Sequence, residues 1–224
     1  TIKRNPYYVG IDPAGNQLPY IDEVRFTFYA DKEALNLAAV AGEIDFQGRH
    51  INMGSYPVLK ENEDTGNYRV VTWPTFGGSD AVVMFNQTWE GPEIVAFQNK
   101  DFRIALSYAI DREAIKELSF FGLGESRQGV PAPFHPYYPG DEYAFKYTEF
   151  DPDKANSILD GVMPDKDDEG YRTLPDGSPL DIEIGVVPQF GAWVDIGQLI
   201  VENWAEVGVR AHIEVRERTQ HFSM

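Results

Sequence analysis

The clearest alternation of hydrophobic and polar positions lies in the last third of the chain. Residues 180–186 and residues 209–215 alternate apolar side chains with other, mostly charged ones, which is the period-two pattern of half-buried strands. Between them, residues 194–207 carry apolar side chains at roughly helical spacing, and Gly208 suits the left-handed end of that helix. A strand, a helix and a strand within roughly 37 residues predict a right-handed crossover between parallel strands.

Further helices are predicted where an apolar stripe follows a capping residue. Asp31, Asp111 and Asp151 each precede such a stripe and are suited to accept from the free backbone amides of its first turn. Pro152 would occupy the first helical position, where its fixed φ fits a helix. The predicted helices lie between Asp31 and Gly42, over residues 56–60, over residues 102–110, between Asp111 and Gly122, and from Pro152 to about Leu159.

Shorter apolar runs predict strands in the first half of the chain. Residues 24–28 alternate apolar and polar positions, and residues 44–46 and 68–72 read as short strands. Residues 81–85 are continuously apolar, as expected for a strand covered on both faces. The first two strands, with the helix between them, predict a second parallel pair. Because strands and helices alternate, the predicted fold class is α/β, with mixed sheets flanked by helices.

Charge and composition exclude several classes of protein. With 36 acidic residues against 19 Lys and Arg, the 224-residue chain has a formal charge of −17. That charge repels phosphate backbones and anionic lipid, so no nucleic acid is expected as a partner. The chain has no cysteine, which excludes disulfides, thiolate metal sites and Cys nucleophiles. No apolar run approaches the ~18 residues of a membrane-spanning helix.

Catalytic motifs are missing from the sequence. It has no GxGxxG, no phosphate-binding GxxxxGKS or GxxxxGKT run, no GxSxG and no HExxH pattern. The four histidines are scattered, and His212 is expected to face solvent on a strand. With 36 acidic residues, pairs of carboxylates arise by chance. The sequence therefore predicts a protein that is not an enzyme and that needs no cofactor. A fragment of a secreted hydrolase, acting on carbohydrate or cleaving peptides, is the alternative.

Residues 165–176 imitate a calcium-binding loop. Asp165, Asp167 and Glu169 stand at the first, third and fifth places, with a glycine at the sixth and Asp176 at the twelfth. A calcium loop of this kind carries the longer Glu at its twelfth place, and the Leu-Pro-Asp-Gly run looks like a second turn. The pattern therefore favours a polar hairpin between a helix and a strand, with the calcium site as the alternative.

Candidate ligand-binding residues lie in two loops. Trp73 and Phe76 are in a Gly-rich connection, whereas Phe190 and Trp193 lie between the carboxyl end of a strand and the next helix. Open α/β sheets hold ligands at that second place, where flat aromatic faces stack on sugar rings or peptide side chains. The alternative is that these rings seal the loops onto the core. The candidate ligand-binding residues are Trp73, Phe76, Gly78, Ser79, Phe190 and Trp193.

Several short motifs follow one another along nearly the whole chain. They are residues 4–8 (RNPYY), 15–22 (GNQLPYID), 41–45 (AGEID), 84–86 (MFN), 102–113 (FRIALSYAIDRE), 147–159, 170–172 (GYR) and 175–177 (PDG). In this order they resemble the family 5 extracellular solute-binding proteins, the dipeptide- and oligopeptide-binding components of ABC importers.

The resemblance implies a periplasmic-binding-protein type II fold, in which two α/β lobes close around a solute. Residues 1–79 would be part of the first lobe and residues 80–224 most of the second, ligand-closing lobe. The hinge would cross near residues 81–86, with Gly77 and Gly78 absorbing the backbone change. The chain is accordingly expected to be a truncated piece with an incomplete two-lobe architecture.

The resemblance also implies a non-catalytic role, in which a captured peptide or oligosaccharide is delivered to ABC transporter permease subunits in the membrane. Peptides and oligosaccharides stay level as solutes. Residues 16–20 and 102–107 resemble those of family members that handle oligosaccharides as well as peptides, and Trp73 and Trp193 suit stacking on sugars. The implied location is periplasmic or extracellular. The complete protein would be either free or anchored by a lipid on a cysteine upstream of Thr1.

Overall fold

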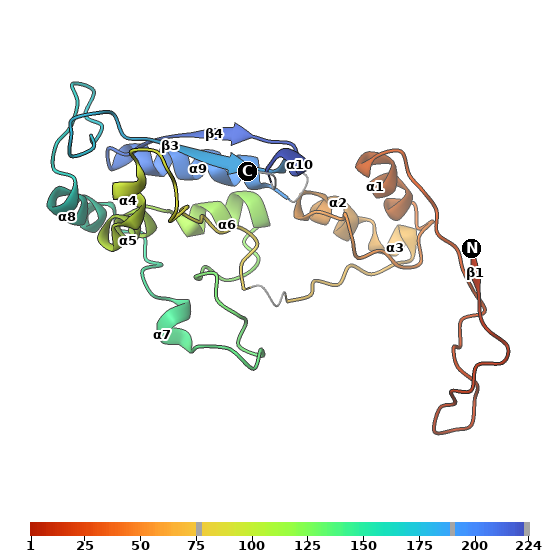
Figure 1. Cartoon of the computed structure of the whole chain (residues 1–224). Helices are drawn as coiled ribbons and strands as arrows, with labels where there is room; N and C mark the ends of the chain where they lie inside the picture. The colour runs from red at the N-terminus through yellow and green to blue at the C-terminus, as the bar shows by residue number, and fades with distance from the viewer. Residues whose placement is uncertain (75–77, 189–190, 222–224) are drawn as a thin grey trace. The chain divides into compact units, whose positions relative to one another are not determined.

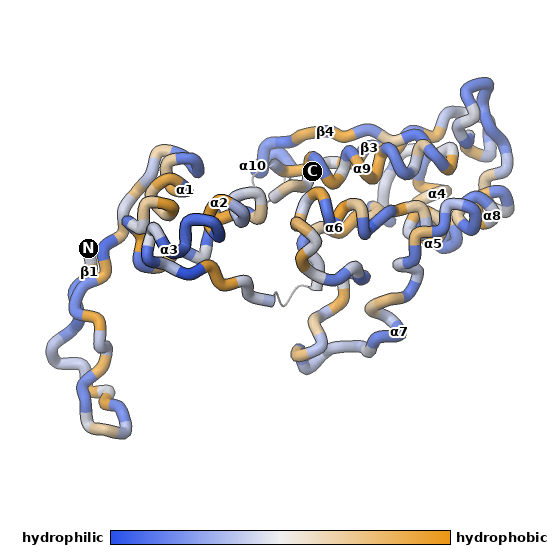
Figure 2. Tube along the Cα trace, turned by 180° about the vertical axis from the view of Figure 1, so that it is seen from behind, coloured by the Kyte–Doolittle hydropathy of each residue, from blue (hydrophilic) through white to orange (hydrophobic). Residues whose placement is uncertain are grey.

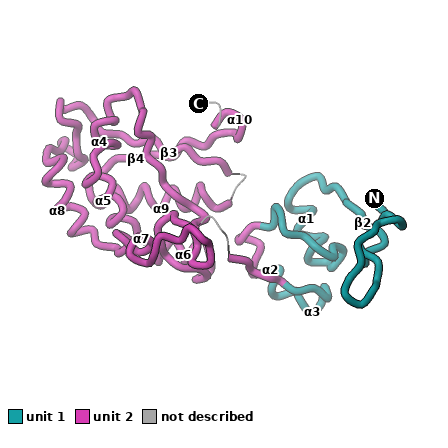
Figure 3. Tube along the Cα trace, turned by 60° about the horizontal axis from the view of Figure 1, so that its bottom comes forward, with its two compact units in different colours: residues 1–51, 58–69 teal, residues 52–57, 70–224 magenta. Residues whose placement is uncertain are grey.

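The structure is a computed structural model that describes residues 1–74, 78–188 and 191–221 (Figure 1). The chain forms two compact units, a smaller one of residues 1–51 and 58–69 and a larger one of residues 52–57 and 70–224 (Figure 3). The described residues between 70 and 79 therefore make most of their contacts within the larger unit. The assignment of residues 1–79 and 80–224 to two lobes stays a prediction.

The smaller unit contains a two-stranded antiparallel sheet and short helices. Its elements are β1 (Ile2–Lys3), β2 (Glu23–Val24), α1 (Lys32–Val40), α3 (Glu63–Gly66) and most of α2 (Tyr56–Glu61). The carboxylate of Asp31 caps α1 by accepting from the backbone N–H of Ala34 at 2.8 Å. Gly42 follows with φ +71, and a Cβ there would lie 2.1 Å from the carbonyl oxygen of Gly66. Both helices predicted for this part of the chain are confirmed.

The strands predicted in the first half are wrong apart from one short start. Strand β2 ends at Val24, and neither residues 44–46 nor residues 68–72 form strands. Phe26 and Phe28 are 62% and 96% exposed, and Figure 2 shows further hydrophobic residues along the segment before α1. Alternation marks a face suited to burial, but a strand also needs a neighbouring backbone for its hydrogen bonds. No described segment supplies that neighbour, so the second parallel pair is absent from the described residues.

The larger unit contains the crossover predicted for the last third. Its elements are η1 (Met53–Ser55), α4 (Ile94–Gln98), α5 (Lys100–Tyr108), α6 (Arg112–Phe120), α7 (Asp141–Ala144), α8 (Pro152–Val162), β3 (Asp181–Val186), α9 (Trp193–Glu206), β4 (Arg210–Val215) and α10 (Arg218–His221). Strands β3 and β4 pair in parallel, from Asp181 opposite Arg210 to Val186 opposite Val215. The strand–helix–strand prediction is confirmed, as are the three helices predicted between residues 102 and 159.

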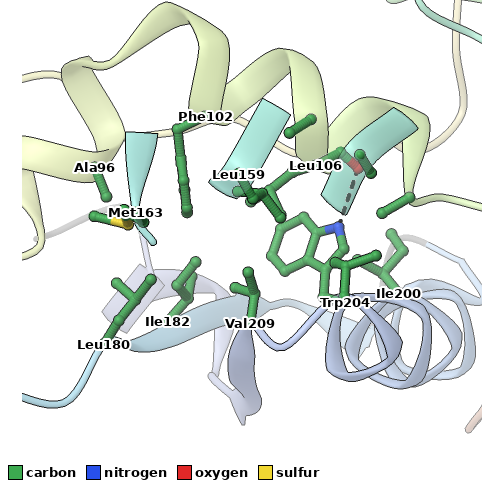
Figure 4. Close-up of a cluster of buried hydrophobic side chains, with 14 of the residues drawn as sticks. Ala96, Phe102, Leu106, Leu159, Met163, Leu180, Ile182, Ile200, Trp204 and Val209 are labelled. Atoms are coloured by element: carbon green, nitrogen blue, oxygen red, sulfur yellow. Dashed lines mark hydrogen bonds between the residues drawn. The ribbon is translucent and has the colours of Figure 1, made fainter. Parts of the chain in front are cut away.

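The core of the larger unit lies between two sets of elements. Helices α5 and α8 pack together on one side, and β3, α9 and β4 lie on the other (Figure 4). Trp204 on α9 is 1% exposed, and its indole N–H donates to the carbonyl oxygen of Leu106 on α5 at 3.2 Å. Other fully buried members of this core are Phe102, Leu159, Leu180 and Val209. Because α9 packs into this core, the first residue of the helix, Trp193, has a fixed position next to the core.

The apolar run at residues 81–85 is partly buried on one face and exposed on the other, and it forms no strand. Val82 and Met84 are 52% and 86% exposed, whereas the three odd-numbered residues pack against the core. Phe85 stacks on Trp204 with ring centroids 6.1 Å apart. The continuous apolar run predicted burial on both faces, but alternate residues of the segment are exposed.

Side chains cap the first turns of three helices of the larger unit, α5, α6 and α8. Asp111 accepts from the N–H of Ala114 at the start of α6, and Asp151 accepts from the N–H of Lys154 in α8, each at 2.9 Å. Both caps are as predicted. Asn99, which was not predicted, caps α5 by accepting from two backbone amides.

Replacement of Asp111 by Ala is expected to lower the free energy of unfolding by about 1 kcal/mol, because the Ala114 amide loses its acceptor. The matched variant Asp111→Ser keeps an oxygen at the cap and should recover most of that loss. Urea titrations of the complete protein provide the measurement. An Ala variant as stable as the parent would show that this cap contributes nothing to stability.

Candidate functional site

Trp193 connects the two loops in which candidate residues were predicted. It is the first residue of α9, which follows the loop from the carboxyl end of β3. Its indole Nε1 donates to the carbonyl oxygen of Asp80 at 2.9 Å, across 113 positions of sequence. The ring also packs against the hydrophobic core. The hydrogen bond therefore ties the loop that ends near Asp80 to the start of α9.

Gly78 and Ser79 shape the backbone of that tied loop. Gly78 has φ +75, and a Cβ there would lie 1.6 Å from the carbonyl oxygen of Val130, so only glycine fits. The hydroxyl of Ser79 donates to the carbonyl oxygen of Ala81 at 2.7 Å. Close packing against Val130 leaves Gly78 little freedom as a hinge. Gly77, the other glycine of the predicted hinge, lies outside the described residues.

The remaining candidates are aromatic. Trp73 is 70% exposed, so most of its surface is open to solvent in the larger unit. Phe76 and Phe190 lie outside the described residues. The structure thus joins Trp193 to Asp80, the residue that follows Gly78 and Ser79. A ligand site shared by these residues and Trp73 stays a prediction.

A hollow of about 380 Å³ in the larger unit was missed from the sequence. It lies where the end of α6, the first turns of α9 and η1 come together, and its lining residues are Gly54, Leu118, Ser119, Phe121, Ala192, Asp195, Gln198 and Leu199. Asp195, Gln198 and Leu199 share one face of α9 because they stand three and four positions apart. That spacing was visible in the sequence, but nothing local indicated that the end of α6 lies opposite.

Three acidic residues of the calcium-like loop, Asp167, Glu169 and Asp176, form side-chain hydrogen bonds within the protein. Asp167 accepts from two backbone amides, and the guanidinium of Arg210 donates to Asp167 at 3.2 Å and to Glu169 at 2.7 Å. At Asp176, the hydroxyl of Ser178 donates to the carboxylate and holds the pKa of that group below its ordinary value. Among the described residues, no cluster of three or more His, Cys, Asp or Glu is placed to hold a metal ion. The segment forms turns closed by isolated antiparallel bridges, as the hairpin prediction requires.

Polar side chains of β3 contact side chains on and just after β4. His212 Nδ1 lies 3.0 Å from Asp181 Oδ1, and Arg216 pairs with Glu183. His212 thus faces outward as predicted and has a partner on the neighbouring strand. Because both side chains of the His212–Asp181 pair are about half exposed, solvent weakens their interaction.

A family profile described as bacterial extracellular solute-binding proteins, family 5 Middle, matches residues 1–223. The chain belongs to this family. Family 5 members are binding proteins rather than enzymes, and they are extracellular or periplasmic. None of the helices that the structure describes has the length and apolar character needed to span a bilayer. The resemblance inferred from the sequence is confirmed.

Two curated proteins resemble this family 5 chain. The periplasmic alpha-galactoside-binding protein of Rhizobium meliloti is 29% identical in an alignment 205 residues long, which covers 82% of this chain and 28% of that protein. A probable ABC transporter-binding protein of Deinococcus radiodurans is 27% identical in an alignment 181 residues long, which covers 74% of this chain and 30% of that protein. The chain therefore spans less than a third of the length of either relative.

Solved structures of transport-related binding proteins share the fold. The oligopeptide-binding protein OppA matches with a TM-score of 0.72 and 40% identity, over 99% of this chain and 36% of that one. MelB of Agrobacterium fabrum, solved in complex with stachyose, matches with a TM-score of 0.64 and 22% identity, over 99% of this chain and 35% of that one. The predicted type II periplasmic-binding-protein fold, incomplete in this chain, is confirmed.

Proposed function

We propose that the complete protein captures a peptide or an oligosaccharide between two lobes and delivers it to the permease subunits of an ABC importer. The observation that carries this proposal is the family match over residues 1–223 together with 40% identity to OppA over 99% of the chain. The printed names of the relatives include an oligopeptide-binding and an alpha-galactoside-binding protein. We therefore retain both solute classes.

The proposed mechanism is lobe closure around the solute. A solute that contacts both lobes binds the closed form more tightly and shifts the population towards it, and the permease then recognises the closed form. Residues 1–79 would belong to one lobe and residues 80–224 to the other, with the hinge crossing near residues 81–86.

The proposed contact surface consists of the exposed ring of Trp73, the rings of Phe76 and Phe190, and the face of Trp193. The N–H of Trp193 is already engaged by Asp80, so that residue would contact solute through its ring. Gly78 and Ser79 would act by fixing the backbone between these rings.

We infer further that the captured solute is released unchanged, and that the protein works in the periplasm or outside the cell, either free or lipid-anchored. The family consists of binding proteins, which gives the alternative of a hydrolase fragment no support.

Binding without turnover is the decisive prediction. A panel of neutral oligosaccharides and of peptides, each added to the complete protein, should contain members that raise its melting temperature. A ligand at a hundredfold its Kd stabilises the folded state by about 2.7 kcal/mol. Mass spectrometry of the recovered ligand should show the starting compound only.

Two results would contradict this proposal. Release of a shorter saccharide or peptide would place the protein among hydrolases, provided that replacement of one carboxylate pair abolished the release. No stabilisation by any member of either panel would remove the support for solute capture. A heat-denatured sample, treated with the same panel, controls for ligand breakdown that is independent of the folded protein.

A further inference from the structure

The hollow between α6 and α9 has a lining unlike that of the predicted aromatic site. Its apolar part is formed by Leu118, Phe121, Ala192 and Leu199, and its polar side chains include Asp195 and Gln198. None of the predicted site residues that the structure describes belongs to this lining. At about 380 Å³, the hollow falls within the size range of small-molecule sites, which are mostly apolar with a few polar groups.

Phe121 stands at a backbone position that aromatic residues rarely occupy. Its φ of 55° and ψ of 38° are left-handed, and glycine is the residue that adopts this conformation most readily at the end of a helix. The sequence pattern placed the helix stop at Gly122, one residue later. Phe121 is nevertheless 44% exposed, so burial in the core does not account for an aromatic ring at this position. Because Phe121 lines the hollow, a contact with a ligand there would account for the aromatic ring.

The polar groups of the hollow favour neutral ligands rich in hydroxyl groups. The lining residues include one carboxylate, that of Asp195, and no Lys, Arg or His. A ligand carboxylate or phosphate would therefore find no cation there. A carboxylate accepts hydrogen bonds, whereas the amide of Gln198 both donates and accepts, which is what a sugar hydroxyl requires. Because Asp195 is exposed, its attraction for a ligand cation is weakened by solvent.

We propose that this hollow is a subsite for one neutral sugar residue of an oligosaccharide. The ring of Phe121 would pack against the apolar face of the sugar, and Asp195 and Gln198 would bind its hydroxyl groups. The inference rests on the proposed function, since it assigns a solute class to one part of the same solute-binding protein. The rival ligand is a cationic peptide side chain, for which the same ring and carboxylate would serve.

The test uses isothermal titration calorimetry on the complete protein with two panels of probes. One panel contains neutral galacto-, gluco- and manno-oligosaccharides, and the other contains neutral peptides and trilysine. Phe121→Gly removes the ring but suits the left-handed backbone, and it should raise the Kd of the bound oligosaccharide about tenfold. Leu123→Ala is the matched control, because Leu123 is 40% exposed in the same loop but does not line the hollow. The control should change Kd by less than about twofold.

Asp195→Asn separates a sugar from a cation. The amide oxygen still accepts from a hydroxyl, so oligosaccharide affinity should fall only a few-fold and should not depend on salt. A cationic peptide would instead lose most of its affinity, and its binding to the parent would weaken as salt is added.

Each outcome decides the matter. Oligosaccharide binding that is weakened by Phe121→Gly and not by Leu123→Ala supports the subsite. Oligosaccharide binding that Phe121→Gly leaves unchanged overturns it. Binding of peptides alone also overturns it, while leaving the proposed capture of solutes intact. Binding of neither panel refutes both the proposed function and the subsite.

Discussion

Trp204→Ala is expected to lower the free energy of unfolding by about 3–5 kcal/mol. Trp204 is 1% exposed, and it lies between the α5–α8 side and the β3–α9–β4 side of the core (Figure 4). Its ring stacks on Phe85, and its N–H donates to the carbonyl oxygen of Leu106 in the last turn of α5. Carbonyls in a last turn have no partner within their own helix. Alanine would therefore leave both a cavity and an unsatisfied carbonyl.

One variant separates these causes, and a second serves as the control. Trp204→Phe keeps most of the apolar volume but loses the hydrogen bond to Leu106, so a loss of about 1–2 kcal/mol is expected. Trp73→Ala removes an indole that is 70% exposed and should change stability by no more than about 0.5 kcal/mol. Urea unfolding, followed by far-ultraviolet circular dichroism, compares the three variants with the parent. If Trp204→Ala were no more harmful than Trp73→Ala, the core described for the larger unit would be wrong.

The features that were predicted correctly depend on residues close together in sequence. Asp111 and Asp151 each accept from an amide three positions later, so a capping residue followed by an apolar stripe was sufficient to locate α6 and α8. The crossover of β3, α9 and β4 was found for a similar reason, because each element carries its own periodicity and the connections are short.

The strands that were predicted wrongly would each need a partner strand, and a local sequence pattern does not show whether one is present. Residues 24–28 have the alternation of a half-buried strand, yet Phe28 is 96% exposed and only Val24 and Glu23 pair. Hydrophobic alternation indicates which face a segment would bury, but the partner backbone comes from elsewhere in the fold. The run at residues 81–85 shows the same limit, since its sequence does not reveal that Val82 and Met84 are exposed.

The candidate site was predictable only in part. The sequence placed Trp193 in the loop between a strand and the next helix, and the structure makes it the first residue of that helix. Its hydrogen bond to Asp80 spans 113 positions and could not be foreseen. Phe121 was not recognised as the left-handed residue that ends α6, because Gly122 is the residue that typically takes that position. Long-range packing, rather than composition, brings the end of α6 to the first turns of α9.

The side chain of Arg172 donates hydrogen bonds at the C-terminal ends of two helices. Helices α8 and α9 have no basic side chain in their last turns, where a positive charge and hydrogen-bond donors would be favourable. The guanidinium of Arg172 lies in the core, and it donates to the carbonyl oxygens of Met163 at 2.8 Å and Val207 at 3.1 Å. These two residues follow the last turns of α8 and α9. The same group also donates to Asn156 and pairs with Asp160.

Arg172→Ala is accordingly expected to lower the free energy of unfolding by about 3–5 kcal/mol, a loss comparable with that of Trp204→Ala. The variant would leave the carbonyl oxygens of Met163 and Val207 buried without their side-chain donor. Arg172→Lys keeps the charge but has three donors on one atom, which cannot reach carbonyls at two helix ends and two side chains together. We expect it to recover less than half of the loss.

The partner carboxylate provides the matched control. Among the described residues, Asp160 is the only carboxylate that forms an ion pair with Arg172. Because Asp160 is 64% exposed, Asp160→Asn should lower the free energy of unfolding by no more than about 1 kcal/mol. Urea unfolding of the complete protein tests the series. Equal losses for Arg172→Ala and Asp160→Asn would mean that the ion pair, and not the capping of α8 and α9, is what Arg172 contributes. A much larger loss for Arg172→Ala would establish that one guanidinium holds the ends of both helices against the turn before β3.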